Sequence, residues 1–209
     1  MDITTQYPRG RPVLVVVEGS HDIEFLKRLS RILCLASAAV PDLDRREAEG
    51  GLLWIPTGGN HRLWADRLAA LQLPEFHLLD REVPPVTGER QQLIEVIQAR
   101  SGCVARMTSK RAMENYLHPA AIVEAGGMAV EVGDDDDVPE LLARTVQATS
   151  GGPSWESLPR RSRCRLRNRI KRWLTTSVVD RMTPALLAER DPQGEVVGWL
   201  ESIGRLLEP

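Results

Sequence analysis

The run Val13-Leu-Val-Val-Val17 constrains the fold more than any other part of the chain. It is apolar throughout, rich in β-branched residues, and bounded by Pro12 and Glu18-Gly19. A strand that is apolar at every position is typical of a parallel sheet with both faces buried. The run therefore predicts a central strand that is covered by helices on both sides.

Three further segments have the length and composition of strands: Leu52–Ile55, Phe76–Leu79 and Cys103–Met107. Apolar residues recur at helical spacing between them. Strands that alternate with helices in this way imply βαβ crossovers. We therefore expect an α/β fold with a parallel, Rossmann-like sheet flanked by helices, over residues 11–125.

Two of the connections between strands carry further information. Ser20 is expected to cap a helix whose apolar residues recur from Ile23 to Leu33. Thr57-Gly-Gly-Asn60 precedes a helical pattern at Leu63–Leu73. Its backbone amides could contact a phosphate. The segment lacks the lysine and the spacing of a P-loop, so we interpret it as a tight turn.

The chain beyond residue 125 is expected to be mostly helical, with one strand at Met128–Val132. These residues form a predicted C-terminal helical extension over residues 126–209. Ser150-Gly-Gly-Pro153 has the composition of a linker within it. Helical patterns cover approximately residues 138–147, 159–174, 183–190 and 195–207.

The predicted helix at 159–174 is strongly basic. Arg160 to Arg172 holds eight basic residues in thirteen positions and no acidic one, although the formal net charge of the chain is −2. An apolar stripe at helical spacing leaves arginines on another face. We predict that this face binds nucleic-acid phosphates, and a merely solvated face is the alternative. The arginines are Arg161, Arg165, Arg169 and Arg172.

Composition excludes several classes of protein. No segment approaches the roughly 18 apolar residues of a membrane span. Met1–Pro12 lacks the apolar core of a signal peptide, so we expect a cytoplasmic protein. The three cysteines, Cys34, Cys103 and Cys164, show no CxxC spacing, which argues against a zinc site and a disulfide framework.

Carboxylates directly follow two of the predicted strands. Glu18 ends the first strand, Asp80 and Glu82 end the third, and Asp22 falls in the first turn of a helix. The carboxyl ends of parallel strands meet at one edge of a sheet, where ligands bind. Carboxylates held together there repel one another unless a cation neutralises them, and oxygen ligands suit Mg²⁺ or Mn²⁺. Each carboxylate taken alone could instead cap a helix or face solvent.

Three motifs resemble those of TOPRIM domains, a family that includes topoisomerases, bacterial primases and OLD-family (overcoming lysogenization defect) nucleases. Val15-Val-Val-Glu-Gly-Ser-His-Asp22 and Leu78-Leu-Asp-Arg-Glu82 resemble the two signature motifs. Lys110-Arg-Ala-Met-Glu-Asn-Tyr-Leu117 is similar to the ENYL stretch of OLD nucleases. Lys171 also falls about where those nucleases place a catalytic lysine.

This resemblance implies a divalent-metal-dependent endonuclease that hydrolyses phosphodiester bonds of nucleic acid, DNA rather than RNA, with two Mg²⁺ or Mn²⁺ ions. Glu18 would bind one ion and help to activate the attacking water, and Lys171 would neutralise charge on the phosphate. Glu114 could be an outer-shell ligand, orient Lys110, or act only as a capping carboxylate. The remaining implied metal ligands are Asp80 and Glu82 in the metal shell, and Asp22 on the second ion.

The chain departs from the family in two ways. Asp80-Arg-Glu82 stands where the family commonly has DxD. We expect no counterpart of the ATPase domain that precedes TOPRIM in OLD proteins, because the first predicted strand begins at Val13. Either a separately encoded ATPase partners this chain or the chain works alone. The sequence leaves open whether it forms a homo-oligomer.

Other activities compete with a nuclease. A topoisomerase needs a tyrosine nucleophile on a further domain, and only Tyr7 and Tyr116 are present. A primase needs additional domains for its template. A non-catalytic nucleic-acid-binding or regulatory subunit remains an alternative, since Glu82 replaces an aspartate. In a receiver-like signalling domain Asp80 would be phosphorylated, although Glu18-Gly19 stands where an acidic pair is expected.

Overall fold

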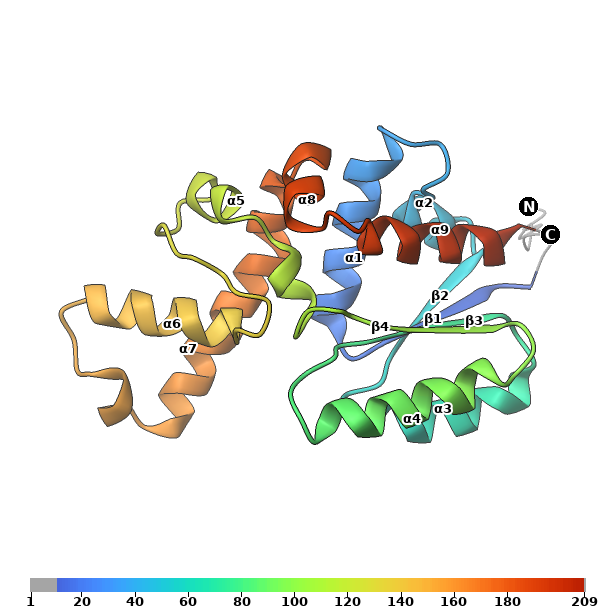
Figure 1. The fold of residues 1–209 in the computed structure, drawn as a ribbon, viewed down its shortest axis with the longest axis horizontal. Helices are drawn as coiled ribbons and strands as arrows, with labels where there is room; N and C mark the ends of the chain where they lie inside the picture. Colours follow the sequence, from blue (N-terminus) through green and yellow to red (C-terminus); the bar gives the residue numbers. More distant parts are fainter. Residues whose placement is uncertain (1–10, 209) are drawn as a thin grey trace, which may run out of the picture.

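A computed structural model of the chain describes residues 11–208. Four strands form one all-parallel sheet in the order β2-β1-β3-β4 (Figure 1). This confirms the predicted α/β class with a parallel sheet flanked by helices. The strands are β1 (Val13–Val17), β2 (Leu52–Pro56), β3 (Glu75–Leu79) and β4 (Cys103–Met107).

Helices cover both faces of the sheet (Figure 1). Alternate residues of β1 serve the two faces, since Val15 belongs to the cluster that includes α1 and α9, whereas Leu14 and Val16 pack with Leu68 of α3. This explains why β1 is apolar at every position. On one face lie α1 (Ser20–Cys34), α2 (Leu43–Ala48) and α9 (Glu195–Leu207), and on the other α3 (His61–Leu68), the turn η1 (Ala69–Leu71) and α4 (Val86–Gln98).

The strand order places a topological switch between β1 and β3. The chain leaves β1 toward β2 on one side, then crosses β1 through α3 to form β3 on the other side. Connections that diverge in this way open a crevice at the carboxyl ends of the two central strands, where open α/β sheets bind ligands. Glu18 and Asp80 follow those two strand ends directly.

The chain after β4 is helical, and α6 and α7 form a hairpin that extends away from the sheet (Figure 1). A π-helical turn, η4, continues α7 toward α1. The segments are η2 (Met113–Tyr116), α5 (Pro119–Glu124), α6 (Val138–Thr149), η3 (Trp155–Ser157), α7 (Arg160–Trp173), η4 (Leu174–Val178), η5 (Val179–Arg181) and α8 (Pro184–Arg190).

The main apolar cluster joins the sheet to the helical C-terminal region. It includes Phe25 of α1, Tyr116 of η2 and Trp199 of α9. The rings of Tyr116 and Trp199 pack edge to face, with centroids 5.1 Å apart, an arrangement that stabilises beyond the buried area alone. One core therefore spans both predicted regions, 11–125 and 126–209.

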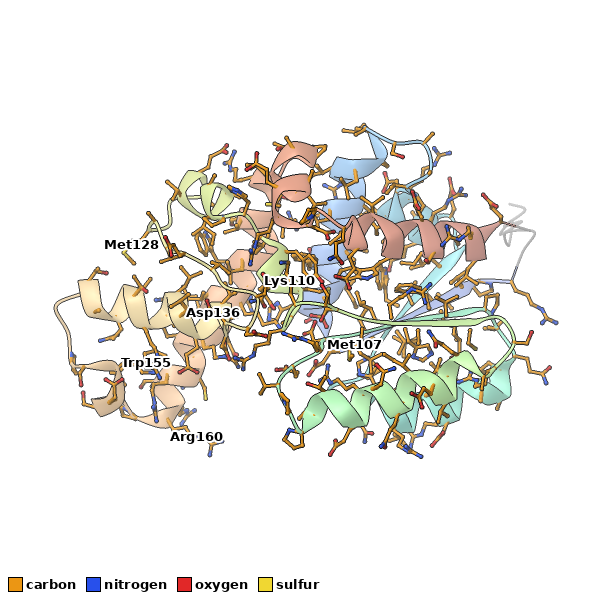
Figure 2. The ribbon with its side chains drawn as sticks, in the orientation of Figure 1. Met107, Lys110, Met128, Asp136, Trp155 and Arg160 are labelled. Atoms are coloured by element: carbon orange, nitrogen blue, oxygen red, sulfur yellow. The ribbon has the colours of Figure 1, made fainter. Side chains whose placement is uncertain are left out.

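Several predicted boundaries differ from the structure. Ser20 does not cap α1, because the helix begins at Ser20 and Gly19 occupies the N-cap position. The helix predicted at Leu63–Leu73 begins earlier, at His61, and ends at Leu68 before η1. The strand predicted at Met128–Val132 is wrong, since this segment forms a loop between α5 and α6. Met128 lies away from the sheet (Figure 2), so the segment has no strand to pair with.

Among the described residues, no helix combines the length and the apolar character that crossing a bilayer demands.

Candidate active site

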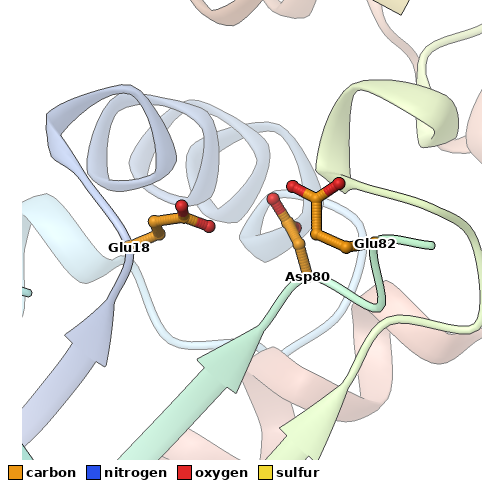
Figure 3. A group of neighbouring side chains, drawn as sticks. All are labelled: Glu18, Asp80 and Glu82. Atoms are coloured by element: carbon orange, nitrogen blue, oxygen red, sulfur yellow. The ribbon is translucent and has the colours of Figure 1, made fainter. Parts of the chain in front are cut away.

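Three carboxylates meet at the switch between β1 and β3. Glu18, Asp80 and Glu82 each offer an oxygen, and these oxygens all lie within 4.8 Å of one another. Glu18 extends from the end of β1 toward the other two (Figure 3). A group of this kind could hold a metal ion. The predicted convergence of carboxylates from two strand ends is thereby present in the structure.

The chain after β3 turns sharply and brings Asp80 and Glu82 together. Glu82 has a positive φ of 56°, a conformation that non-glycine residues adopt uncommonly. Its N–H donates to the carbonyl of Arg111 at 2.8 Å. Asp80 is only 4% exposed, and its Oδ1 accepts the N–H of Met113 at 3.2 Å. The segment around Met113 therefore fixes both carboxylates.

Lys171 of α7 contacts a second pair of carboxylates, Glu114 and Asp22, which are buried beside the first group. Its Nζ lies 3.1 Å from Glu114 Oε1 and 4.0 Å from Asp22 Oδ1. Glu114 and Asp22 are 2% and 3% exposed. Asp22 Oδ2 accepts the N–H of Gly19 at 2.8 Å, so it helps to begin α1. Asp22 lies outside the group of three carboxylates that share the 4.8 Å limit.

The electrostatics of the site favour an additional cation. Burial raises the pKa of Asp80 well above its ordinary value, and the charges of Asp22 and Glu114 raise it further. Burial also raises the pKa of Asp22 to about 6, against the opposing charge of Lys171. Burial lowers the pKa of Lys171, but Glu114 and Asp22 outweigh it, so its pKa lies above the ordinary value. Lys171 and two arginines, Arg90 and Arg111, face five carboxylates at this end of the sheet, so the site remains short of positive charge.

A cavity of about 200 Å³ opens over the carboxylates. It connects the strand ends with the hairpin of α6 and α7, so a ligand at the carboxylates would also face Lys171. Its charged lining residues are Glu18, Asp80, Glu82, Arg111, Glu114, Asp136, Asp137, Arg167 and Lys171.

Lys110 does not pair with Glu114. Its Nζ donates to Asp134 Oδ1 at 2.6 Å and lies 5.5 Å from the centre of the Tyr116 ring. The interpretation in which Glu114 orients Lys110 is therefore wrong, because Glu114 faces Lys171 instead. Spacing along the chain cannot distinguish these two lysines, since α7 comes to Glu114 only through tertiary packing.

Two arginines that the sequence analysis did not single out contact the carboxylates. Arg90 of α4 lies 3.4 Å from Glu18 Oε2, and its other terminal nitrogen donates to the carbonyl of Asp80. Arg111 Nε lies 3.6 Å from Glu82 Oε2. No motif marks Arg90, whereas Arg111 belongs to the ENYL-like stretch.

The acidic run at 134–137 fastens the hairpin to the site. Asp137 caps α6, with Oδ1 accepting the N–H of Glu140 at 3.0 Å. It also accepts from Arg167 of α7 at 2.8 Å and lies 3.6 Å from Arg111. Pro139 in the first turn of α6 is a recognisable sign of a helix start at this position.

The predicted nucleic-acid face of α7 is exposed. Arg161, Arg165, Arg169 and Arg172 all lie on the protein surface. Of the eight basic residues in α7, only Arg167 and Lys171 form ion pairs among the residues that the structure describes. The exposed arginines are thus not neutralised by carboxylates of the described chain. The helix runs from the carboxylate site outward to Arg160 (Figure 2).

Tyr116 does not provide a nucleophile at this site. Tyr116 is fully buried, and its hydroxyl donates to Glu195. Burial and this carboxylate raise its pKa, which disfavours the phenolate. Tyr7 lies outside the described residues.

Comparison of the chain with protein-family models, with curated proteins and with solved structures finds no match. The geometry above is therefore the basis for any functional conclusion, together with the three sequence motifs that resemble TOPRIM domains.

Proposed function

We propose that this chain is a divalent-metal-dependent nuclease that resembles the TOPRIM domain of OLD-family proteins. One observation carries the proposal: Glu18, Asp80 and Glu82 share a rim within 4.8 Å, beside a cavity that Lys171 also lines. Two separate strand ends and the distant helix α7 supply these groups. A set of carboxylates, an ammonium and a nearby basic surface is what phosphodiester hydrolysis requires.

The carboxylates fit Mg²⁺ or Mn²⁺. All three candidate ligands are oxygen donors without histidine or thiolate, which hard divalent cations prefer. Asp80 is buried, and its pKa is raised. The site therefore has oxygen ligands for a cation but too little positive charge to balance them. When bound, the metal would polarise the phosphate and lower the pKa of a water. Glu18 and Glu82 are partly exposed whereas Asp80 is buried, so the two glutamates are positioned to meet substrate.

Lys171 supplies a fixed positive charge. Glu114 and Asp22 hold its ammonium in place, so it can stabilise negative charge on a phosphate without reorganising. The exposed arginines of α7 would bind the phosphates of a nucleic acid that extends away from the site. We propose DNA as the substrate. Regulation by a separately encoded ATPase is also part of the proposal.

The test is an incubation of supercoiled plasmid with the protein and Mn²⁺ or Mg²⁺. Wild-type protein should nick or linearise the plasmid, and chelation with EDTA should prevent this. Glu18→Ala and Asp80→Ala should each abolish cleavage. Asp66→Ala, an exposed carboxylate of α3, is the matched control and should cleave as the wild type does. Undiminished cleavage by both site variants, with circular dichroism unchanged, would refute the proposal.

A second candidate function, nucleic-acid binding without cleavage, is favoured by the arginines at the site. Arg90 and Arg111 lie 3.4 and 3.6 Å from Glu18 and Glu82 and so partly neutralise the carboxylates without a metal. Isothermal titration with Mn²⁺ separates the two functions. A nuclease should bind Mn²⁺ in a way that Asp80→Ala eliminates, whereas a non-catalytic subunit should bind DNA with no dependence on metal.

A further inference from the structure

A second recess lies on the other side of Glu18, between α3 and α4. Its volume is about 360 Å³. We call it the α3–α4 pocket. Because Arg90 lines it and also contacts Glu18, the recess adjoins the carboxylate rim. Its polar and charged lining residues are Asn60, His61, Arg62, Glu89, Arg90 and Gln92.

The turn before α3 forms one wall of this pocket. Gly58 and Gly59 have φ values of +62° and +85°, a conformation that costs glycine little. The N–H of Gly58 donates to the carbonyl of Glu18 at 2.8 Å. A Cβ on Gly59 would lie 3.7 Å from Glu18 Oε1. The turn therefore lies directly against the Glu18 side chain.

This wall presents unused hydrogen-bond donors. The N–H groups of Gly59, His61 and Arg62 have no acceptor among the described residues. The N–H of Leu63, by contrast, donates to Asn60 Oδ1 at 3.3 Å. Free N–H groups at the start of a helix bind anions, because they point outward along the helix dipole.

His61 holds this turn in place. It is 5% exposed and lines the pocket. Its Nδ1 lies 3.1 Å from Thr57 Oγ1, while its Nε2 has no partner of ordinary hydrogen-bond geometry within the described chain. Nε2 has almost no accessible surface, and the ring lies against the backbone of Leu78 in β3, so His61 braces the turn against the sheet and leaves the backbone amides to face the recess.

The side-chain charges of the recess also favour an anion. Arg62 is exposed and has no ion pair among the described residues. Arg90 adds a second guanidinium, although Glu18 shares it. Glu89 is the single carboxylate in the lining. Two guanidinium groups and free amides around one carboxylate suit a phosphate.

We propose that the α3–α4 pocket binds one nucleotide of a single strand, next to the phosphodiester at Glu18, with its phosphate on Arg62 and the amides of the turn. The choice of ligand rests on the proposed function. The recess has the volume of a small-molecule site, which accommodates a nucleotide and excludes a duplex. Single-stranded or unpaired regions are therefore the substrate class.

The test compares Arg62→Ala with Arg67→Ala, both in an Asp80→Asn background that isolates binding from cleavage. Arg67 belongs to the same helix but does not line the pocket. The probe is a short labelled oligothymidylate, measured by fluorescence anisotropy over a salt series. Arg62→Ala should weaken binding about fivefold or more and lower the salt slope by about 0.7, as expected for one lost phosphate contact on a single strand. Arg67→Ala should stay within about twofold of its parent.

A duplex of the same length is the second probe. The loss from Arg62→Ala should be smaller for the duplex, and equal losses would overturn the assignment to a single strand. Equal binding by the Arg62 and Arg67 variants would overturn the pocket itself. If Arg62→Ala weakens binding while the protein with wild-type sequence cleaves nothing in Mn²⁺, the pocket stands and the nuclease proposal fails. The two proposals therefore fail separately.

Discussion

Lys171 Nζ lies 3.1 Å from Glu114 Oε1, and this contact ties α7 to the carboxylate end of the sheet. Glu114 comes from η2 and is almost completely buried. The ammonium has two consequences. It compensates the charge of Glu114, which burial removes from water. It also remains beside the cavity where a phosphate would lie.

Removing the ammonium should destabilise the fold. Lys171→Met leaves Glu114 buried without its partner, and such a loss costs about 3 kcal/mol. The double variant Lys171→Met with Glu114→Gln removes both charges and should recover at least half of that cost. Urea denaturation followed by circular dichroism measures both values. A Lys171→Met protein as stable as the wild type would show that Lys171 does not compensate the buried Glu114.

Stability without metal should fall as pH rises through the pKa of Asp22, about 6. A carboxyl whose pKa is raised by folding stabilises the fold below its unfolded pKa, and this contribution disappears as the group ionises. Asp22→Asn cannot ionise and should be more stable than the wild type at pH 8 by roughly 2–3 kcal/mol in EDTA. At pH 4 the two proteins should differ much less.

Metal should stabilise the protein more at pH 8 than at pH 5. Cations compete with protons for carboxylates, and Asp80 has a strongly raised pKa. Thermal melts with Mn²⁺ and with EDTA at the two pH values give the comparison. A metal effect that is the same at both pH values would place the ion elsewhere.

The exposed face of α7 should govern affinity for DNA. Arg161→Glu combined with Arg165→Glu should weaken duplex binding at least about tenfold and lower the salt slope by about 2, one contact for each arginine. Arg45→Glu combined with Arg46→Glu is the control, because it changes the net charge equally and both arginines are exposed but lie on α2. Filter binding between low and moderate salt measures the slope. If the control and the double variant lose the same affinity, the effect is only one of net charge.

Asp137 should stabilise the α6–α7 hairpin in two separable ways. Asp137→Asn keeps a capping side chain but removes the ion pairs with Arg167 and Arg111, whereas Asp137→Ala removes both. Loss of a cap costs about 1 kcal/mol, so the alanine variant should be the less stable one. Burial opposes the shift, but the hydrogen bond from Arg167 lowers the pKa of Asp137.

The ion-pair part of this stabilisation should be present at neutral pH and lost as acid protonates Asp137. The difference between wild type and Asp137→Asn should therefore shrink as pH falls below about 4, the ordinary range of an aspartate. Urea titrations at pH 7 and pH 3 test this. A difference that grows on acidification would contradict it.

The sequence predicts the sheet well because β1 is apolar at every position, and such a run has few structural alternatives. It also predicts that Glu18 and Asp80 converge, since both follow strand ends. That inference needs β1 and β3 to be neighbours, and the strand order that makes them so is a property of the crossovers rather than of any local pattern.

Other parts of the site depend on tertiary contacts that have no local signature. Arg90 reaches Glu18 from α4, and Lys110 turns to Asp134 instead of Glu114. Met128–Val132 has the alternation of a strand, yet it is a loop because neither edge of the sheet lies beside it. The Gly58-Gly59 turn was recognisable as a turn, but its position against Glu18 follows from the pairing of β1 with β2.

Helix α9 covers the face of β1 and β3 opposite α3, with Leu200 and Ile203 fully buried there. The first strand and this helix are separated by almost the whole described chain. While the protein is being translated, that face of the sheet has no α9 to cover it until residues 195–207 have left the ribosome. The amino-terminal strands therefore complete their packing on this face only after almost the whole chain has been made.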